Sequence, residues 1–376
     1  MGYLQLMRLF FCVFLIFIAA PVFAQKNYYL LVGTYTGGKS TGLYVYDFNT
    51  NDGSVRMVDS VQTPNPSYVA VAPNQKFIYA VSETQRGNYS GKVRSFSFDK
   101  KTGKLNFINE GASVGDNPCY LIVDKTGRWV IVGNYTSGTL AVLPISNDGS
   151  LGEAVSNYRH WGKGVNTQRQ EAPHVHSTVL SPDNKYLFVQ DLGIDKIIVY
   201  SFNENTGAIT PKDSVKLQDG SGPRHFTFHP NGKWAYVVQE MSGTVTAFGY
   251  QKGRLKNMQT ISALPQGFDK SFSSADIHVS NDGKFLYAST RDAANILTIF
   301  KIDQKTGRLS VVGQQPVLGK TPRNFNFDPG GNYLLVANQN SNNVVVFKVD
   351  RKTGLLTDTG NRIDVGNPVC LKWIEK

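Results

Sequence analysis

Cysteine is scarce in this chain, with 3 residues among 376. Cys12 lies in an apolar N-terminal segment, so Cys119 and Cys370 are the cysteines of the remaining sequence. Two cysteines cannot form the framework of several disulfides that stabilises many small secreted domains. They fall in distant repeats of the pattern described below, so we do not expect them to pair with each other. A chain of this length with 41% hydrophobic residues can instead bury a large core.

Signatures of several other protein classes are absent. No segment has a convincing helical period, and no linker or low-complexity run divides the chain. The glycine pairs Gly37-Gly38 and Gly330-Gly331 precede no predicted helix, so they indicate turns rather than phosphate-binding loops. Neither a nucleophile elbow nor a zinc-protease helix motif occurs. The composition, with 36 glycines and 18% charged residues, is that of a folded all-β protein with many turns.

Long apolar runs are confined to the N-terminus. The run extends from Leu9 to Ala20, follows Arg8, and precedes a small-residue cleavage site that ends at Ala24. This order predicts a secretory signal peptide over residues 1–24 and export to the periplasm or out of the cell. The alternative is an uncleaved membrane anchor, but the run is shorter than the roughly 20 apolar residues that a span needs. We therefore expect no membrane span after cleavage.

Acidic residues are outnumbered, with 28 Asp and Glu against 39 Lys and Arg and a net charge of +11. Cleavage of the signal peptide removes Arg8 and leaves +10. Much of the positive charge lies in predicted hairpin tips such as residues 99–103, 303–307 and 350–354. No stripe of Lys and Arg with stacking aromatic residues occurs, so solvated turn residues are favoured over a nucleic-acid-binding surface. The basic field still favours anionic ligands.

One strand motif returns seven times along the chain at a spacing of about fifty residues. Its copies are NPSYVAVAP (65–73), NPCYLIVD (117–124), HVHSTVLSP (174–182), GPRHFTFHP (222–230), SSADIHVSN (273–281), TPRNFNFDP (321–329) and NPVCLKW (367–373). Six copies are followed by a short turn and a second β-rich run, then by two further strands with alternating apolar residues. Repeated units of four antiparallel strands predict an all-β, seven-bladed β-propeller over residues 25–376. A β-sandwich or a split sheet is the alternative.

The two ends of the chain are complementary. The last repeat contains only a first strand, and the sequence after the signal peptide begins with three strands, YYLLVGTY (28–35), GLYVYDF (42–48) and SVRMVDSVQ (54–62). These four strands together make one complete blade. The sequence therefore predicts that the N- and C-terminal strands pair and close the ring.

Alignment of the repeats identifies the residues at one mouth of the central channel. The first strand of each blade lies nearest the axis, and the second runs antiparallel beside it. The first strands contribute Ser67, Cys119, His176, Arg224, Ala275, Arg323 and Val369 at equivalent positions. The second strands end there with Tyr35, Glu83, Tyr135, Leu192, Glu240, Arg291 and Gln339. Positions two residues further along the first strands are mostly apolar and indicate packing between blades.

One sector of this mouth carries the candidate catalytic residues His176, Arg224, Glu240 and Arg291, with Arg323 as a substrate-binding residue. Arginine binds carboxylate or phosphate through paired N–H donors and stabilises an oxyanion. His176 has an intrinsic pKa suited to proton transfer near neutral pH, and Glu240 either orients it or acts as the base. Together these groups suit attack of water on a lactone carbonyl.

Four more residues complete the expected substrate contacts. They are His174, Asp191, Asn338 and Gln339.

Several of these residues have other interpretations. His174 and His176 have the spacing of two metal ligands on one strand face, with Glu240 or Asp191 as a third, but we prefer proton transfer or substrate binding and expect no metal. A structural role is also possible for both histidines. The arginines at the heads of inner strands also suit ion pairs between blades, and Asn338 suits binding of loop backbone groups. A further set, His225, His229 and His278, occupies positions where other repeats have Tyr, Ala or Thr, which favours a structural role.

The ordered motifs APHVHSTVLSPDNKYLFVQDLG, GPRHFTFHPNGKWAYVVQE, IHVSNDGKFLYASTRD and TPRNFNFDPGGNYLLVANQ resemble the seven-bladed lactonase family. This family includes bacterial 6-phosphogluconolactonase and fungal carboxy-cis,cis-muconate cyclase. The resemblance covers the chain from about Asn27 to Lys376. It implies active-site roles for His176 or His174, for Arg224 and for Glu240. It also implies a role for the arginine of the family's S-N-R-G motif, which reads Ser289-Thr290-Arg291-Asp292 here.

The resemblance implies hydrolysis of an anionic sugar lactone without a cofactor, or the related lactone-forming cyclisation of an unsaturated diacid. The expected partner is a small anionic sugar lactone or related carboxylate, and the expected state is a monomer. Export separates the chain from the cytoplasm, where 6-phosphogluconolactone is made, so the sequence leaves the lactone unnamed. The alternative is an exported propeller without catalytic activity that binds a glycan or a protein at its axial mouth.

Overall fold

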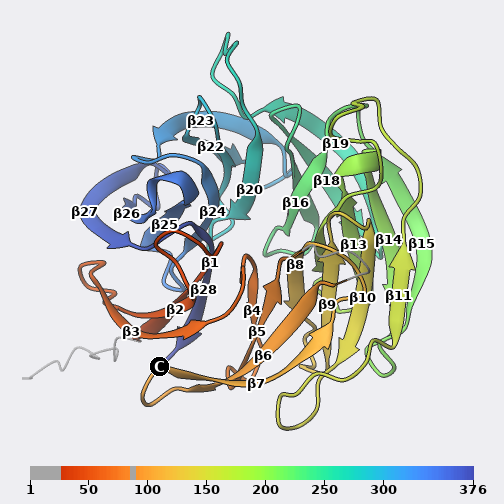
Figure 1. Cartoon of the computed structure of the whole chain (residues 1–376). Helices are drawn as coiled ribbons and strands as arrows, with labels where there is room; N and C mark the ends of the chain where they lie inside the picture. The colour runs from red at the N-terminus through yellow and green to blue at the C-terminus, as the bar shows by residue number, and fades with distance from the viewer. Residues whose placement is uncertain (1–26, 85–89) are drawn as a thin grey trace, which may run out of the picture.

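The computed structural model describes residues 27–84 and 90–376, and the predicted signal peptide at 1–24 lies outside these ranges. The described residues form seven four-stranded antiparallel sheets arranged as blades around a central axis (Figure 1). In six of these sheets the strands follow one another in chain order from the axis outward, and in the remaining one the C-terminal strand precedes the first three. The inner strands of neighbouring blades contact each other all the way round the ring. The predicted seven-bladed propeller is confirmed.

The strands of six blades are consecutive in the chain. The first of these six blades contains β4 (Val69–Val71), β5 (Phe77–Ser82), β6 (Lys92–Asp99) and β7 (Lys104–Ala112). The next two contain β8 (Pro118–Val123), β9 (Trp129–Asn134), β10 (Thr139–Pro144) and β11 (Ser156–Arg159), then β12 (Val175–Leu180), β13 (Tyr186–Asp191), β14 (Lys196–Phe202) and β15 (Ile209–Lys216). The following two contain β16 (Pro223–Phe228), β17 (Trp234–Gln239), β18 (Thr244–Gln251) and β19 (Arg254–Ser262), then β20 (Ser274–Val279), β21 (Phe285–Thr290), β22 (Ile296–Ile302) and β23 (Leu309–Pro316). The last contains β24 (Pro322–Phe327), β25 (Tyr333–Asn338), β26 (Asn343–Val349) and β27 (Leu356–Asp364).

The seventh blade joins the two ends of the chain. Its strands are β28 (Pro368–Glu375), β1 (Tyr28–Thr34), β2 (Gly42–Phe48) and β3 (Val55–Gln62), with β28 nearest the axis. Figure 1 shows the blue C-terminal strand beside the red N-terminal strand. The antiparallel register runs from Tyr28 opposite Glu375 to Thr34 opposite Pro368. The predicted closure of the ring by the terminal strands is therefore confirmed.

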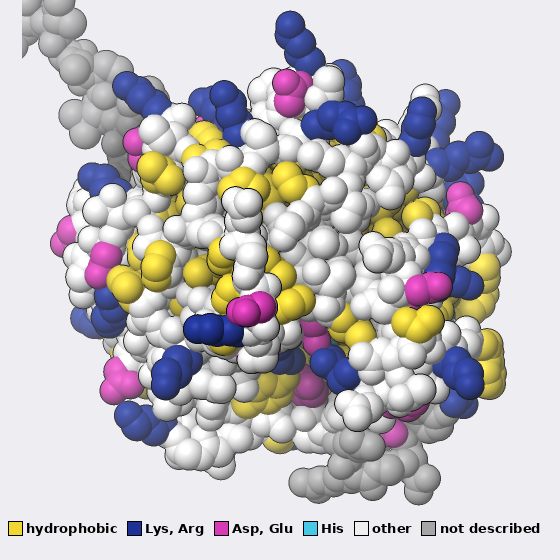
Figure 2. Space-filling model, turned by 90° about the horizontal axis from the view of Figure 1, so that it is seen from above, with side chains coloured by type: hydrophobic (Ala, Val, Ile, Leu, Met, Phe, Trp, Pro, Cys, Tyr) yellow, Lys and Arg dark blue, Asp and Glu magenta, His cyan; other side chains and the backbone are white. Residues whose placement is uncertain are grey.

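The hairpin tips that carry many of the lysines are built by their Asp and Gly residues. In the tip between β6 and β7, the Asp99 carboxylate accepts hydrogen bonds from Lys101 N at 2.8 Å and from Thr102 Oγ1 at 2.8 Å. Gly103 has a φ of 73°, which favours glycine because a side chain strains this conformation. Lys101 itself is exposed, as a solvated turn lysine should be. On the face shown in Figure 2, Lys and Arg side chains are scattered among acidic and apolar ones.

Helical structure in the described residues is limited to two 3-10 turns, η1 (Leu192–Ile194) and η2 (Gln339–Ser341). Each follows the second strand of its blade, after β13 and β25. Among the described residues, no helix is long and apolar enough to cross a membrane. Cys119 and Cys370 are buried and unpaired, as predicted from their positions in distant repeats.

Candidate active site

A β-bulge at the start of the inner strands determines which side chains reach the channel. On β12, Val175 pairs with Asp191 and Ser177 pairs with Gln190, so His176 between them has no partner on β13. The same irregularity recurs in β8, β16, β20, β24 and β28. The skipped residues include Cys119, Arg224, Arg323 and Val369. A bulged residue is re-aimed relative to its neighbours, which explains why these positions vary in the repeat alignment while their neighbours pack between blades.

A cavity of about 570 Å³ lies at the mouth where these bulges occur. Of the predicted residues, it brings together His176, Glu240, Arg291 and Arg323. The remaining lining includes Glu83, Cys119, Tyr135, Arg169 and Asp292. A second, much smaller cavity of about 10 Å³ lies deeper in the channel and is lined by Arg224 together with His176, Glu83 and Arg323. The predicted catalytic residues therefore surround one region of the channel.

Glu240 is the centre of an arginine cluster. Its Oε2 accepts a hydrogen bond from Arg224 Nε at 2.9 Å and lies 3.1 Å from Arg291 Nη2. Its Oε1 accepts a hydrogen bond from Arg169 Nη2 at 2.6 Å. Burial alone would raise the pKa of Glu240, but Arg291, Arg224 and Arg169 outweigh it and lower that pKa to about 2. The carboxylate is therefore ionised at neutral pH and is a weak proton acceptor.

His176 is buried and uncharged. Burial lowers the pKa of its imidazole well below 6.5, and the nearby Arg224, His225 and Arg323 lower it further. Its Nε2 lies 3.9 Å from Glu240 Oε2, which is too long for a hydrogen bond. This nitrogen is therefore available to a water molecule or a substrate in the cavity.

A second carboxylate, that of Glu83, faces the same cavity but has different hydrogen-bond partners and a different pKa shift. Glu83 Oε2 accepts a hydrogen bond from Tyr35 Oη at 2.9 Å and another from Ser67 Oγ. Tyr35 Oη in turn accepts a hydrogen bond from Arg323 Nη2 at 2.9 Å. Burial raises the pKa of Glu83, and Arg323, Ser67 and Tyr35 offset this only in part. The cavity thus holds one strongly ionised carboxylate, Glu240, and one that takes up a proton more readily.

A chain of hydrogen bonds extends from Arg224 away from the cavity. Arg224 Nη1 lies 3.1 Å from His225 Nε2, His225 Nδ1 lies 2.7 Å from Asp276 Oδ1, and His278 Nε2 lies 2.9 Å from Asp276 Oδ2. A guanidinium nitrogen only donates, so His225 Nε2 accepts and Nδ1 carries the proton donated to Asp276. Burial and Arg224 together lower the pKa of His225 to about 4, which keeps this ring neutral. His225 thus links Arg224 to Asp276 by hydrogen bonds.

Four of the predicted substrate-binding residues do not line the cavity. Asp191 is fully buried and accepts hydrogen bonds from His160 Nδ1 at 2.6 Å and from His174 N at 2.7 Å. Asn338 donates to Val317 O at 3.2 Å, and Gln339 belongs to the 3-10 turn η2. The strands β13 and β25 are each followed by a 3-10 turn, which turns the chain before the side chains of Asp191, Asn338 and Gln339 reach the mouth. The His174 ring stacks at a centroid distance of 4.4 Å on Tyr135, which itself lines the cavity.

The structure adds Arg169, which the repeat alignment did not select. Arg169 belongs to the segment 160–174 between β11 and β12, which lies outside the repeated strands. Its side chain is 44% exposed and binds Glu240 at the rim of the cavity. The unusual length of the segment 160–174 was the one feature of the sequence that could have pointed to a site residue there. In the described part of the chain, no group of three His, Cys, Asp or Glu side chains is arranged to hold a metal ion.

The sequence is similar to those of known proteins over most of its length. Residues 29–373 match the model of the family described as lactonase, 7-bladed beta-propeller. A 6-phosphogluconolactonase from Formosa agariphila is 39% identical over 321 residues, which is 84% of this chain and 90% of that protein. A 6-phosphogluconolactonase from Bacillus subtilis is 36% identical over 355 residues, which is 94% of this chain and 100% of that protein.

Solved structures give the same picture. The structure of a periplasmic gluconolactonase from Pseudomonas aeruginosa superimposes with a TM-score of 0.88 and 39% sequence identity. The superposition covers 93% of this chain and 99% of that protein. These similarities extend over the whole ring rather than one blade.

Proposed function

Since the chain belongs to the seven-bladed β-propeller lactonase family, we propose that it hydrolyses a sugar lactone carrying an anionic group. The observation that carries this proposal is the charge around the channel. Four guanidinium groups, those of Arg169, Arg224, Arg291 and Arg323, surround the buried carboxylate of Glu240, the partly buried carboxylate of Glu83 and one neutral histidine. Asp292, at the exposed rim, is the remaining acidic residue of the lining. Such a site favours a negatively charged ligand and an oxyanion formed during reaction.

His176 is the proposed general base. A water molecule attacks the lactone carbonyl carbon and gives a proton to His176 Nε2, while the carbonyl oxygen becomes an oxyanion. Arginine N–H groups of the cavity stabilise this oxyanion. The bond from the carbonyl carbon to the ring oxygen then breaks, and the imidazolium returns the proton to that oxygen. The product is the open-chain hydroxy acid, and water has been added without a cofactor.

Glu240 has a supporting role in this scheme. A carboxylate with a pKa of about 2 binds protons too weakly to act as base near neutral pH. Its negative charge instead holds Arg224 and Arg291 in place and favours the imidazolium of His176 that forms during the reaction. We therefore assign proton transfer to His176 alone and the positioning of the arginines to Glu240.

The substrate is proposed from the relatives and from the predicted export. The related proteins are named for 6-phosphogluconolactone and gluconolactone hydrolysis, and the Pseudomonas aeruginosa protein is described as periplasmic. If residues 1–24 direct export, the substrate is an aldonolactone present outside the cytoplasm. The anionic group then is a carboxylate or a phosphate on the sugar.

A direct assay of purified protein tests the proposal. Gluconolactone, its 6-phosphate and a uronic-acid-derived lactone are hydrolysed with pH-stat detection of the acid released, after subtraction of the spontaneous rate. We expect the anionic lactones to give higher kcat/KM than neutral gluconolactone. Rates equal to the spontaneous rate for all three would instead support a ring that only binds glycans or proteins.

Removal of the rim arginine should affect substrate binding more than turnover. We expect Arg169→Ala to raise KM for an anionic lactone about tenfold and to leave kcat within about twofold, because the lost hydrogen bonds involve a charged group and serve substrate and transition state alike. Arg159→Ala is the matched control, since this exposed arginine stacks on Trp161 at 4.7 Å instead of lining the cavity. An unchanged KM for Arg169→Ala would show that this guanidinium does not contact the substrate.

A further inference from the structure

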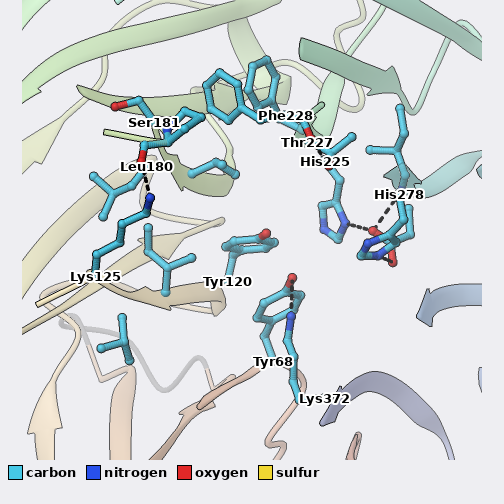
Figure 3. A pocket seen from close by; sticks show the side chains of 17 residues that line it. Tyr68, Tyr120, Lys125, Leu180, Ser181, His225, Thr227, Phe228, His278 and Lys372 are labelled. Atoms are coloured by element: carbon cyan, nitrogen blue, oxygen red, sulfur yellow. Dashed lines mark hydrogen bonds and ion pairs between the residues drawn. The ribbon is translucent and has the colours of Figure 1, made fainter. Parts of the chain in front are cut away.

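A third cavity, which we call the far cavity, lies at the opposite mouth of the channel. It has a volume of about 420 Å³. Its lining comes from the far ends of the inner strands, such as Val123 at the end of β8, Leu180 at the end of β12 and Phe228 at the end of β16. The candidate active site uses the beginnings of the same strands. Figure 3 shows side chains of several blades surrounding this space.

The far cavity and the cavity of the candidate active site are separated within the channel. Between them lies the space of about 10 Å³, and its lining shares Tyr68 and His225 with the far cavity. A space of that size is at the limit for a single water molecule, so no sugar can pass. The far cavity is therefore a separate compartment rather than an exit from the candidate active site.

The walls of the far cavity are largely apolar. Ile122, Val179 and Phe228 are half-buried and line it from three neighbouring blades. Tyr68 and Tyr120 also line it, with their rings stacked at a centroid distance of 4.0 Å. A cavity of this volume with apolar walls suits a small molecule with a flat or compact apolar body.

The polar groups of the far cavity leave an excess of positive charge. Lys372 Nζ lies 4.7 Å from the centre of the Tyr68 ring and 3.4 Å from Tyr68 Oη, and Lys125 Nζ donates to Pro182 O. Both ammonium groups belong to residues that line the cavity (Figure 3). Among the described residues, neither ammonium group forms an ion pair with a carboxylate. The lysines therefore remain able to bind an anion.

The single carboxylate in the lining, Asp276, does not neutralise these lysines. It is 2% exposed and accepts hydrogen bonds from His225 Nδ1 and His278 Nε2. It also accepts one from Asn324 Nδ2 at 2.5 Å and one from Phe325 N at 3.2 Å. Its oxygens are thus used by hydrogen bonds within the protein, and none of these bonds comes from Lys125 or Lys372.

We propose that this far cavity is a second binding site, for a small organic anion with one carboxylate and an apolar or aromatic body. The apolar walls contact the body, and Lys372, whose ammonium group lies beside Tyr68, binds the carboxylate. The proposed lactone has the opposite character, because its hydroxyl groups find few partners among Ile122, Val179 and Phe228. The two mouths of one channel therefore select chemically different ligands.

Binding of benzoate, with uncharged benzamide as its isostere, tests the proposal. We expect calorimetry and saturation-transfer NMR to show benzoate binding that weakens with added salt, and benzamide binding at least about threefold weaker. Lys372→Met keeps the apolar stem but removes the charge, and should weaken benzoate binding about three- to fivefold. Lys352→Met, at an exposed hairpin tip, is the matched control and should have no effect.

Other outcomes would overturn the proposal. They are absence of benzoate binding, equal affinity for benzamide, or equal effects of Lys372→Met and Lys352→Met. Displacement of benzoate by gluconate would place the probe in the candidate active site instead. Because the compartments are separate, His176→Ala should leave benzoate binding unchanged. Failure of the lactone assay therefore does not decide this proposal, and failure of benzoate binding does not decide the lactonase proposal.

Discussion

Replacement of His176 by alanine is expected to lower kcat for lactone hydrolysis about a thousandfold, the usual contribution of a positioned general base. The imidazole is the one neutral proton acceptor that the cavity presents beside the arginine cluster in the described residues. KM should change little, because the arginines that bind the anionic group remain. Steady-state kinetics with an anionic lactone measure both parameters.

The pH dependence of the wild-type protein provides a second measure of the same residue. The pKa of His176 is well below 6.5, so the neutral, active form persists into mildly acidic solution. We expect kcat/KM to stay constant as the pH falls through 6.5 and to decline only in solution well below that pH, as the imidazole takes up a proton. For the His176→Ala variant, His229→Ala is the control, since this buried histidine donates a hydrogen bond from Nε2 to Gly283 O at 2.8 Å and lines neither mouth. Wild-type kcat in His176→Ala would assign the base elsewhere, and Glu83 is then the next residue to test.

Replacement of Glu240 by glutamine is expected to destabilise the fold as well as to lower the activity. The amide leaves Arg224, 1% exposed, and Arg291, 8% exposed, without their buried counter-charge. Removal of one partner from a buried ion pair costs about 3 to 5 kcal/mol, so the free energy of unfolding should fall by about that amount in chemical denaturation. Glu110→Gln breaks the more exposed pair with Arg94 and should cost less than about 1 kcal/mol.

The same carboxylate should make stability depend on pH. The pKa of Glu240 is lowered in the folded state from 4.5 to about 2, so the ionised group stabilises the fold at pH values above 4.5. This contribution, about 3 kcal/mol, is lost as the pH falls from about 4.5 to about 2. Unfolding midpoints measured across this range should decline more in the wild type than in Glu240→Gln. Parallel declines in both proteins would show that other carboxylates dominate acid unfolding.

The repeated motif was sufficient to predict the ring and most of its channel. Because β8, β12, β16 and β24 each have one residue that the strand pairing skips, alignment of the repeats placed Cys119, His176, Arg224 and Arg323 at equivalent positions around the axis. The pairing of β28 with β1 followed from the incomplete last repeat. These features repeat, so each copy of the motif supports the interpretation of the others.

The parts of the site that do not repeat could not be obtained in this way. Arg169 lies in a connection with no counterpart in the other blades, so alignment gave no information about it. Asp191 follows the repeat to the end of β13 but caps the 3-10 turn there, accepting from Gly193 N at 3.0 Å. The choice between a ligand contact and a cap depends on backbone direction after the strand, which the strand pattern does not contain. The clustering of three arginines on Glu240 likewise depends on side-chain geometry.

The bulge at the head of the inner strands also has an evolutionary consequence. A residue skipped by the ladder can be exchanged without altering the register of the strands on either side, so mutations there are less constrained by assembly of the ring. Histidine, arginine, cysteine and valine all occupy this position in different blades of the one chain. Exchange of these residues can thus change what the mouth of the channel contacts while the strand pairing that holds the ring stays the same.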